Sequence, residues 1–187
     1  NSHQSDTYSK IPAAMPRKTL DPPADKPNKG EKNYITPAGY RRLVAELDFL
    51  RSKKRPEVVA ALADAAAEGD RSENAEYIYR KRQLRQLDGR MRFLGKRLDI
   101  VAVVDPREQK RRDRVFFGAT VTVENEDGES QTFTIAGGDE IDSAGGVISW
   151  QSPVGRALLG KEVGDAVLVR WDKGQRELTV TGISYPD

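Results

Sequence analysis

A heptad pattern of apolar side chains runs through residues 77–101 and strongly restricts how this half of the chain can fold. Its members are Tyr77, Leu84, Leu87, Met91, Leu94, Leu98 and Val101. A helix with such a stripe needs a second helix against which to bury it. The preceding segment offers one, because Leu43, Leu47 and Leu50 recur at spacings of four and three. We therefore expect an antiparallel α-helical coiled-coil hairpin.

Start and stop signals delimit the two helices of this hairpin. Thr36 can accept hydrogen bonds from the first free amide groups and Pro37 fits the first helical position, so the first helix is predicted to begin there. Gly69 fits the position after a helix end, and Pro106 is predicted to stop the second helix. Pro56 lies inside the first helix, where it removes one hydrogen bond and should bend the rod. With about 30 residues in each helix, the hairpin would be about 45 Å long.

From residue 115 onward the apolar period changes to two, which predicts strands. The predicted strands span residues 119–124, 131–135, 146–150, 166–171 and 177–181. Gly128 and Gly174 end predicted hairpin turns, and residues 154–160 are predicted to form one short helix. The predicted fold class is two-domain, with a coiled-coil hairpin followed by a small α+β domain whose sheet is mostly antiparallel.

Four segments follow from these patterns. Residues 1–32 hold half of the ten prolines and little apolar content, so we predict a disordered N-terminal extension. Either this extension has no function or its basic residues contact a polyanion. The hairpin domain is assigned to residues 33–105, a charged linker to residues 106–114 and the C-terminal domain to residues 115–187.

The composition excludes several kinds of site. The chain has no cysteine, so disulfides and thiolate metal sites are absent, and its one histidine, His3, lies near the N-terminus. A histidine-based zinc site or a Ser-His-Asp triad is therefore not expected. No apolar run approaches the roughly 18 residues of a membrane span and no secretory signal is visible, so we expect a cytoplasmic protein without membrane contact. The net charge is only +2, and any charged partner must be recognised by local charge.

A cluster of acidic residues lies between the two predicted helices. Asp70, Glu73 and Glu76 fall within one short turn, with Arg71 as the only cation among them. One interpretation is helix capping, with Ser72 or Asp70 as the N-cap and the other acids favoured by the helix dipole. The other is a partial site for a hard cation such as Mg²⁺, which is often held by one or two carboxylates while waters and phosphates complete its shell.

The helix that follows this turn is strongly basic. Its cations in residues 80–97 are Arg80, Lys81, Arg82, Arg85, Arg90, Arg92, Lys96 and Arg97. An ordinary solvated face mixes charge signs, whereas here Lys81 and Arg85 place like charges at i,i+4. This favours an anionic partner, most plausibly a nucleic-acid backbone, over a merely solvated face. Tyr77 and Tyr79 either stack on a base or simply pack.

The C-terminal domain shows no catalytic set. It contains acidic residues at Asp139, Glu140 and Asp142, but no histidine or recognisable nucleophile beside them. We interpret the domain as a docking module. Trp150 and Pro153 are candidates for an exposed apolar contact, with core packing as an equally good explanation.

Several of these motifs resemble one family. Residues 69–77 (GDRSENAEY) are similar to the tip motif of the bacterial Gre transcript cleavage factors, as are residues 34–40 and 55–57 at and within the first helix. Residues 115–119, 138–141 and 152–165 resemble signatures of the family's second domain. The likeness runs from about residue 33 to 185 in the expected order, and the Arg-Ser after Gly-Asp favours the GreB branch. Residues 1–32 have no counterpart, and Gly155 replaces an expected alanine.

The resemblance implies an FKBP-like C-terminal domain that docks at the rim of the RNA polymerase secondary channel, while the hairpin tip reaches the polymerase active site. Asp70 and Glu73 would be the functional acidic pair that holds a shared Mg²⁺ during cleavage of the backtracked RNA 3′ end. Asn74, Glu76 and Tyr77 would shape the tip, and a monomer is expected. The implied RNA-binding residues are Arg80, Lys81, Arg82 and Arg85, and the implied docking residues are Asp139, Glu140, Ser152, Pro153 and Arg156.

Three other functions remain open at this stage. One is a secondary-channel regulator that does not promote cleavage, although intact acids at Asp70 and Glu73 argue against it. Another is prolyl isomerisation by the FKBP-like domain, but a fold does not carry a function and no aromatic-lined pocket is evident. The third is a coiled-coil RNA-binding adaptor that acts without polymerase.

Overall fold

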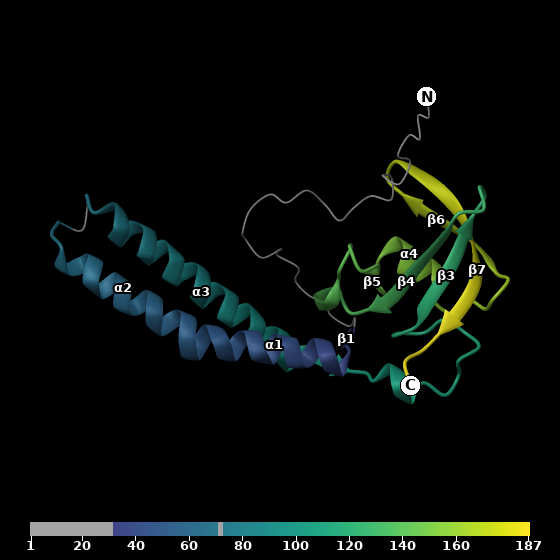
Figure 1. Ribbon diagram of the computed structural model, residues 1–187, viewed down its shortest axis with the longest axis horizontal. Coiled ribbons are helices and arrows are strands. Elements are labelled where there is room, and N and C mark those ends of the chain that lie inside the picture. Colours follow the sequence, from purple (N-terminus) through teal and green to yellow (C-terminus); the bar gives the residue numbers. More distant parts are fainter. Residues whose placement is uncertain (1–31, 71–72) are drawn as a thin grey trace, which may run out of the picture.

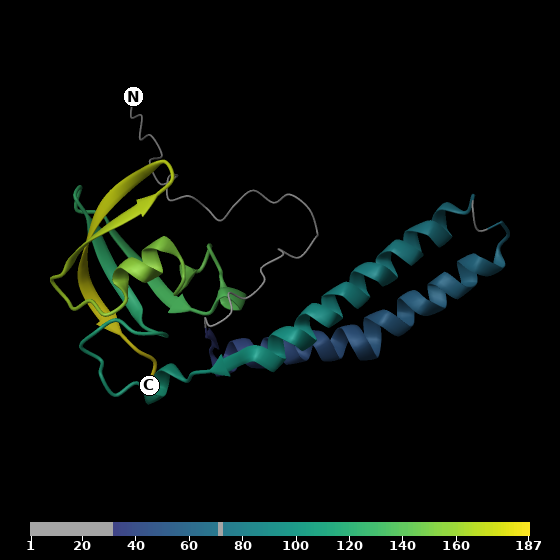
Figure 2. The same cartoon turned by 180° about the vertical axis from the view of Figure 1, so that it is seen from behind.

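The computed structural model describes residues 32–70 and 73–187, which form a helical hairpin and a sheet-containing C-terminal domain (Figure 1). The hairpin projects away from the C-terminal domain, and its tip is the end farthest from that domain in both views (Figures 1 and 2). This arrangement confirms the predicted fold class. The predicted disordered extension lies outside the described residues except for Lys32. Within the described part of the chain, no helix has the length and apolar character needed to span a membrane.

The hairpin is built from one interrupted helical arm and one continuous arm. The first arm comprises α1 (Pro37–Phe49), the π-helical segment η1 (Leu50–Lys54) and α2 (Arg55–Ala67). The second arm is α3 (Ala75–Ile100). Leu43, Leu47 and Val58 of the first arm and Leu94 of the second are buried. The other members of the second stripe are half-buried. The two arms therefore pack against each other along these stripes, as the heptad pattern requires.

The predicted start of the first helix is confirmed in detail. Thr36 is the N-cap of α1, and its Oγ1 accepts a hydrogen bond from the Gly39 amide at 3.1 Å. Pro37 occupies the first helical position, where its missing amide hydrogen costs nothing. At the other end of this arm α2 stops at Ala67, and Gly69 follows with a φ of 137°.

The irregularity expected around Pro56 takes the form of a π-helical turn. The amide of Arg55 donates to the carbonyl of Leu50, five residues earlier, rather than four. In a regular α-helix a proline ring clashes with the carbonyl four residues before it. A wider turn directly before Pro56 relieves this clash and lets the first arm continue as helix.

A small parallel sheet at the base of the hairpin was not predicted. It pairs β1 (Asn33–Ile35) with β2 (Val101–Val103). The prediction that the second helix continues to Pro106 is wrong, because α3 ends at Ile100 and Val101 begins β2. Valine favours extended backbone, and β1 supplies a strand with which residues 101–103 can pair.

The C-terminal domain is a mixed five-stranded sheet with one helix packed on it. Strand order is β5-β4-β3-β7-β6, and every neighbouring pair is antiparallel except β4 with β5. The strands are β3 (Thr120–Asn125), β4 (Ser130–Ala136), β5 (Val147–Ser149), β6 (Ala166–Trp171) and β7 (Gly174–Ser184), and the helix is α4 (Pro153–Leu158). Single 3-10 turns occur at η2 (Pro106–Glu108) and η3 (Gly138–Glu140). The predicted mostly antiparallel sheet with one short helix, which is consistent with an FKBP-like domain, is confirmed.

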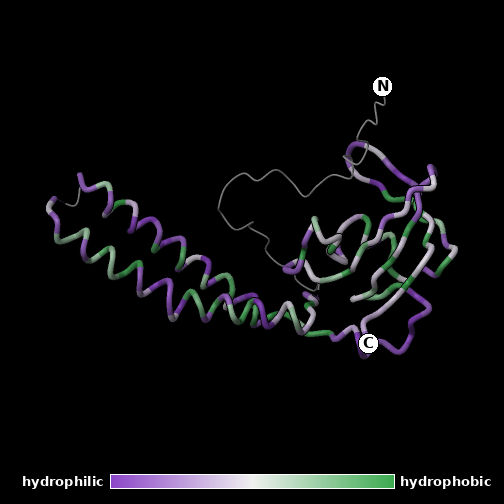
Figure 3. The backbone as a smooth tube through the Cα atoms, viewed as in Figure 1, coloured by the Kyte–Doolittle hydropathy of each residue, from purple (hydrophilic) through white to green (hydrophobic). Residues whose placement is uncertain are grey.

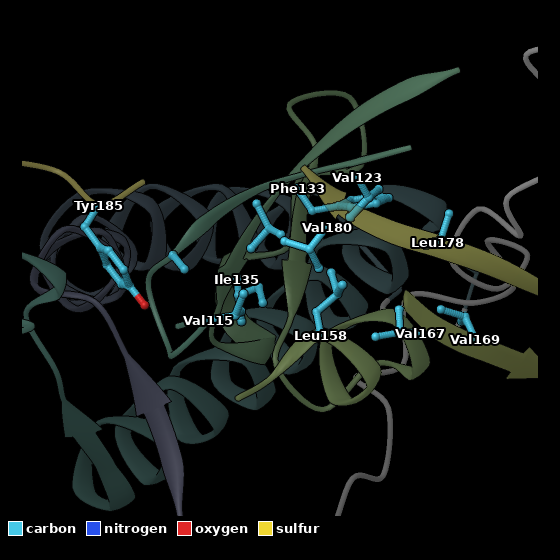
Figure 4. Packing of buried hydrophobic residues seen from close by; sticks show 12 residues of the cluster. Val115, Val123, Phe133, Ile135, Leu158, Val167, Val169, Leu178, Val180 and Tyr185 are labelled. Atoms are coloured by element: carbon cyan, nitrogen blue, oxygen red, sulfur yellow. The ribbon is translucent and has the colours of Figure 1, made fainter. Parts of the chain in front are cut away.

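The core of this domain lies between the sheet and α4 (Figure 4). Val121 and Val123 of β3, Ile135 of β4 and Leu158 of α4 are all fully buried. The alternation along β3 places Thr120 and Thr122 on the other face, where each hydroxyl lies within hydrogen-bond distance of a threonine hydroxyl of β4. A domain with its own core of this kind can act as a unit separate from the hairpin.

Tyr185 ties the end of the chain to the segment before β3. Its hydroxyl accepts a hydrogen bond from the Phe116 amide at 2.9 Å and donates to the Arg114 carbonyl at 2.5 Å. Tyr185→Phe should reduce the free energy of unfolding by about 1–2 kcal/mol, because the Phe116 amide loses its partner. Urea denaturation of the variant beside Tyr79→Phe, a change at an exposed ring, measures this difference.

The same tyrosine gives an expected dependence on alkaline pH. Burial raises the pKa of the Tyr185 hydroxyl above its ordinary value. The unfolded chain therefore loses this proton at a lower pH than the folded chain, so the contribution to stability is complete below pH of about 10 and declines above it. When the pH is raised from neutral to above about 10, the free energy of unfolding should fall more for wild type than for Tyr185→Phe. Equal losses would contradict a raised pKa of Tyr185 in the folded chain.

Candidate functional site

The acidic turn forms the tip of the hairpin, between the end of α2 and the start of α3 (Figure 1). Asp70 and Glu73 are both exposed there, on either side of residues 71–72, which lie outside the described residues. Within the described ranges Glu73 makes no ion pair. The tip therefore presents carboxylates outward at the point of the molecule farthest from the C-terminal domain.

Asn74 holds the tip together by bonds to both arms. Its side-chain oxygen accepts from the Tyr77 amide at 3.0 Å, which makes it the N-cap of α3. Its side-chain nitrogen donates to the Ala65 carbonyl in α2 at 2.7 Å. The N-cap of α3 is therefore Asn74 and not Asp70, because the helix begins later than expected. Ser72, the other candidate, lies outside the described residues.

Asn74→Ala should destabilise the tip by about 1–2 kcal/mol, because it removes the cap and the bond to α2 together. Asn74→Asp separates the two roles, since a carboxylate still accepts from Tyr77 but cannot donate to Ala65. Amide hydrogen exchange at residues 75–78 measures the loss. We expect fast exchange in the alanine variant and an intermediate rate in the aspartate variant.

The other predicted tip residues are engaged on α3 itself. Glu76 accepts from Arg80 at 2.6 Å in an i,i+4 ion pair, so this acid has a partner whereas Glu73 does not within the described residues. Tyr77 is half-buried, and the Lys81 ammonium lies 5.8 Å from its ring centre. Both side chains thus stabilise the first turns of the helix. Their tip-shaping role stays a prediction.

Ion pairs sort the cations of α3 into two groups. The side chains of Arg80, Arg90 and Arg97 each pair with a carboxylate, and the hydrogen-bonded Glu46 raises the pKa of Arg90. Within the described part of the chain, the remaining exposed arginines and lysines of this helix have no acidic partner: Lys81, Arg82, Arg85, Arg92 and Lys96.

The unpaired cations lie mostly along one side of α3. Positions 82, 85, 92 and 96 are separated by three, seven and four residues, which is the spacing of one helix face. The hydropathy view shows hydrophilic colour recurring along this arm, whereas much of α2 is apolar (Figure 3). The structure thus brings together Arg82 and Arg85 of the predicted RNA-binding set. Arg80 is instead held by Glu76, and Arg92 and Lys96 extend the face beyond the predicted residues.

The chemistry of the tip suits part of a magnesium site. Asp70 and Glu73 offer hard oxygen donors, which Mg²⁺ prefers, and it often takes only one or two of them from a protein. Among the described residues, no three acidic or histidine side chains gather where they could enclose a cation. The tip therefore fits a shared site, with the other ligands supplied from outside this chain.

The predicted docking residues fall into two different environments. Ser152 is the N-cap of α4, where its hydroxyl accepts from the Gly155 amide at 3.0 Å, and Pro153 and Arg156 are exposed beside it. In contrast, the side chains of Asp139 and Glu140 are only 9 % and 4 % exposed. Both already have partners in the hairpin, so their predicted contact with a polymerase stays a prediction.

Comparison with protein families decides which family the chain represents. Residues 33–103 match the family model "Transcription elongation factor, N-terminal", and residues 108–185 match "Transcription elongation factor, GreA/GreB, C-term". The chain belongs to the GreA/GreB family of transcription elongation factors. The resemblance seen in the sequence is thereby confirmed.

Its relatives place the chain in the GreB branch of this family. It is 48 % identical to transcription elongation factor GreB of Neisseria meningitidis serogroup B over 154 residues, which cover 82 % of this chain and 94 % of that protein. It is 50 % identical to GreB of Pasteurella multocida over 83 % of this chain and 98 % of that one. For GreB of Pseudomonas aeruginosa the identity is 51 %, over 81 % and 90 %.

Among solved structures, the chain is similar to GreA factor homolog 1 of Thermus thermophilus. The identity is 25 %, the TM-score is 0.38, and the match covers 82 % of this chain and 99 % of the other. A GreA/GreB factor from Nitrosomonas europaea matches at 22 % identity and a TM-score of 0.37 over 83 % and 99 %. At these TM-scores the overlay adds nothing to the fold described above.

Sequence reasoning missed the contacts that join this Gre factor's two domains. Tyr34 lies between Phe117 and Trp150, with ring-centre distances of 5.7 and 5.4 Å. The sequence carried one signal, since Tyr34 belongs to one of the motifs that resembled the family. However, no periodicity pairs it with aromatic residues more than eighty positions away. Trp150, a candidate for exposed contact or core packing, is half-buried and packs on this ring.

Proposed function

We propose that this chain stimulates the hydrolysis of backtracked nascent RNA by bacterial RNA polymerase. The observation that carries the proposal is the exposed acidic pair Asp70 and Glu73 at the far end of a hairpin whose other end joins a separate domain. A protein that worked alone would gather its ligands in one place. A protein that completes another's site needs a projecting tip and a separate anchor.

The anchor would be the exposed N-terminal side of α4, at the rim of the polymerase secondary channel. Ser152 fixes the helix start and Pro153 and Arg156 are accessible there. The hairpin would enter the channel, since α3 alone has 26 residues. At about 1.5 Å per residue it spans about 39 Å. This reach separates the docking surface from the tip chemistry, and the chain is proposed to act as a cytoplasmic monomer.

At the polymerase active site, Asp70 and Glu73 would hold a Mg²⁺ ion together with polymerase carboxylates. When bound, this ion would supply Lewis-acid activation of the attacking water and charge stabilisation at the leaving oxygen. Asp70 is assigned as a direct ligand, and Glu73 as a ligand or as the group that orients the water. Asn74 keeps both in place through its bonds to α2 and α3. The chain is thus an accessory factor, and the polymerase performs the hydrolysis.

The unpaired face of α3 would neutralise the displaced RNA 3′ segment. Arg82 and Arg85 lie nearest the tip, and the ring of Tyr79 is 56 % exposed just before them. Of the two tyrosines considered for base stacking, Tyr79 is therefore the accessible one, whereas Tyr77 is half-buried. Base–aromatic stacking beside a cationic track is a sequence-independent way to hold a single strand.

Arg82→Gln with Arg85→Gln should weaken the factor's hold on backtracked complexes and lower the salt dependence of that binding. The logarithm of the binding constant falls with the logarithm of the salt concentration, and each arginine–phosphate interaction that is removed should make this slope less steep by about 0.7. Binding measured over a series of salt concentrations gives this slope. The matched control is Arg80→Gln, which removes a cation already paired with Glu76 and should change the slope less.

The proposal is tested with purified polymerase stalled in backtracked complexes on a defined template. Addition of the chain should release short 3′ RNA fragments and restore elongation from the new 3′ end. Binding to the complexes without release of fragments would contradict the proposal and would indicate a non-cleaving channel regulator. RNA affinity without any polymerase binding would instead indicate an RNA-binding adaptor.

A further inference from the structure

The joint between the hairpin and the C-terminal domain is built around one buried carboxylate. The Glu140 side chain belongs to the C-terminal domain, yet its Oε2 accepts from the Thr36 amide at 3.0 Å and from its own domain's Gly137 amide at 3.0 Å. Its Oε1 accepts from the Thr36 hydroxyl. Because Thr36 is the N-cap of α1, a residue from one domain completes the cap of the first helix of the other.

The surrounding backbone leaves room for this carboxylate and for little else. A Cβ at Gly39, in the first turn of α1, would lie 2.3 Å from Glu140 Oε1. A Cβ at Gly137 would lie 2.1 Å from the Tyr34 carbonyl oxygen. Both glycines are therefore required by close approach of the two domains. The contact is a specific fit between them.

A second buried pair crosses the same joint. Arg97, near the end of α3, donates to Asp139 at 3.0 Å, with side-chain exposures of 16 % and 9 %. Asp139 is the neighbour of Glu140, so adjacent carboxylates hold one helix from each arm of the hairpin. Together with the contact of Tyr34 with Phe117 and Trp150, these two polar attachments restrict the direction of the hairpin.

The length of the hairpin makes this direction important. Over the roughly 39 Å of α3, a tilt of about 10° at the base displaces the tip by about 7 Å. Oxygen ligands of Mg²⁺ must lie near 2.1 Å in close to octahedral geometry. A rotation of the hairpin by a few degrees at the joint would therefore move Asp70 and Glu73 out of any shared site.

We propose that Glu140, assisted by Asp139, is a positioning residue that sets the angle of the hairpin relative to the docking domain. It acts on the location of the tip through Thr36 and α1. The inference rests on the proposed function for its consequence in cleavage, but the angle itself can be measured on the free protein. The role also explains why these acids are buried in a domain that otherwise carries its charges outside.

The angle can be measured by spin-label distances, because the chain has no cysteine that would interfere. Labels on cysteines at the exposed positions Gln86 of α3 and Lys173 of the β6–β7 turn report the two domains. The test variants are Glu140→Gln, Glu140→Ala and Thr36→Val. Thr36→Ser retains the hydroxyl and serves as rescue, and Glu124→Ala removes an exposed acid of the same domain as a control.

We expect the Glu140→Ala and Thr36→Val distance distributions to shift or to widen about twofold, with Glu140→Gln intermediate, while Thr36→Ser and Glu124→Ala resemble wild type. In the cleavage assay the maximal rate should fall about tenfold or more, since misplacement by about 1 Å can cost as much as a hundredfold. The factor concentration for half-maximal cleavage should stay unchanged, because docking uses another surface.

Unchanged distances in Thr36→Val and Glu140→Gln would overturn the proposal, and so would reduced cleavage that is explained by weaker binding alone. Thr36→Val changes only the hairpin side, so it tests the joint even if Glu140→Ala unfolds the C-terminal domain. If wild type fails to stimulate cleavage, the proposed function fails while the distances still decide the role of Glu140.

Discussion

Asp70→Asn will reduce stimulated RNA cleavage about a hundredfold or more while leaving polymerase binding unchanged. The substitution keeps the size and shape of the side chain and removes its charge. Asp70 is exposed, and the N-cap of α3 is Asn74, so the substitution leaves that cap in place. Single-turnover cleavage in backtracked complexes, at saturating factor, measures the effect.

The matched control is Glu68→Gln, an exposed acid that lies two residues before Asp70 at the end of α2. It removes the same charge from the same tip and should leave cleavage close to wild type. Glu73→Gln should fall between the two if this acid acts on the water rather than directly on the ion. If Glu68→Gln and Asp70→Asn lowered the cleavage rate equally, the acidic tip would act only through its overall negative charge and not through Asp70 as a ligand.

Leu94→Ala will destabilise the hairpin by about 3 kcal/mol, the largest stability effect expected from a single change in this domain. Leu94 is fully buried against Ile35, Leu43 and Leu47 at the base of the hairpin, where both arms and β1 meet. Loss of its side chain leaves a cavity that the surrounding helices cannot fill. Leu94→Met, which nearly conserves volume, should cost less than about 1.5 kcal/mol.

Two spectroscopic signals weight the two domains differently in this experiment, although Trp150 also contacts Tyr34 at the base of the hairpin. Both tryptophans, Trp150 and Trp171, belong to the C-terminal domain, whereas helical ellipticity comes mainly from the hairpin. In urea, Leu94→Ala should shift the ellipticity transition to lower concentration and move the fluorescence transition less. An equal shift of both would show that the domains unfold as one unit.

The sequence predicted those parts of the fold that local patterns encode. The heptad stripe ending in Leu94 and Leu98, the Thr36–Pro37 helix start and the period-two strands all appear in the structure, because periodicity reports which face is buried. The local pattern also singled out the acidic turn with Asp70, Glu73 and Glu76, whereas the choice of Asp70 and Glu73 as the functional pair came from the family resemblance and stays a prediction.

What the sequence could not predict depends on contacts between distant residues. The resemblance implied that Asn74 shapes the tip, but only the position of the Ala65 carbonyl shows that it joins both arms. Val101 continued a heptad but yielded to pairing with Asn33, about seventy residues away. The resemblance implied that Glu140 is a docking residue, and no local pattern pairs it with Thr36, more than a hundred residues earlier. Local propensity is overridden wherever tertiary pairing offers better satisfied backbone groups.

We propose above that Asp70 and Glu73 complete a magnesium site shared with RNA polymerase. The most direct test of this proposal is the Mg²⁺ concentration that gives half-maximal RNA cleavage in backtracked complexes, measured with wild-type factor, with Asp70→Asn and without factor. Wild type should lower this concentration well below that of polymerase alone, and Asp70→Asn should return it to the polymerase value. If wild type accelerates cleavage at every Mg²⁺ concentration without changing the half-maximal one, the tip does not supply ligands and the account is contradicted.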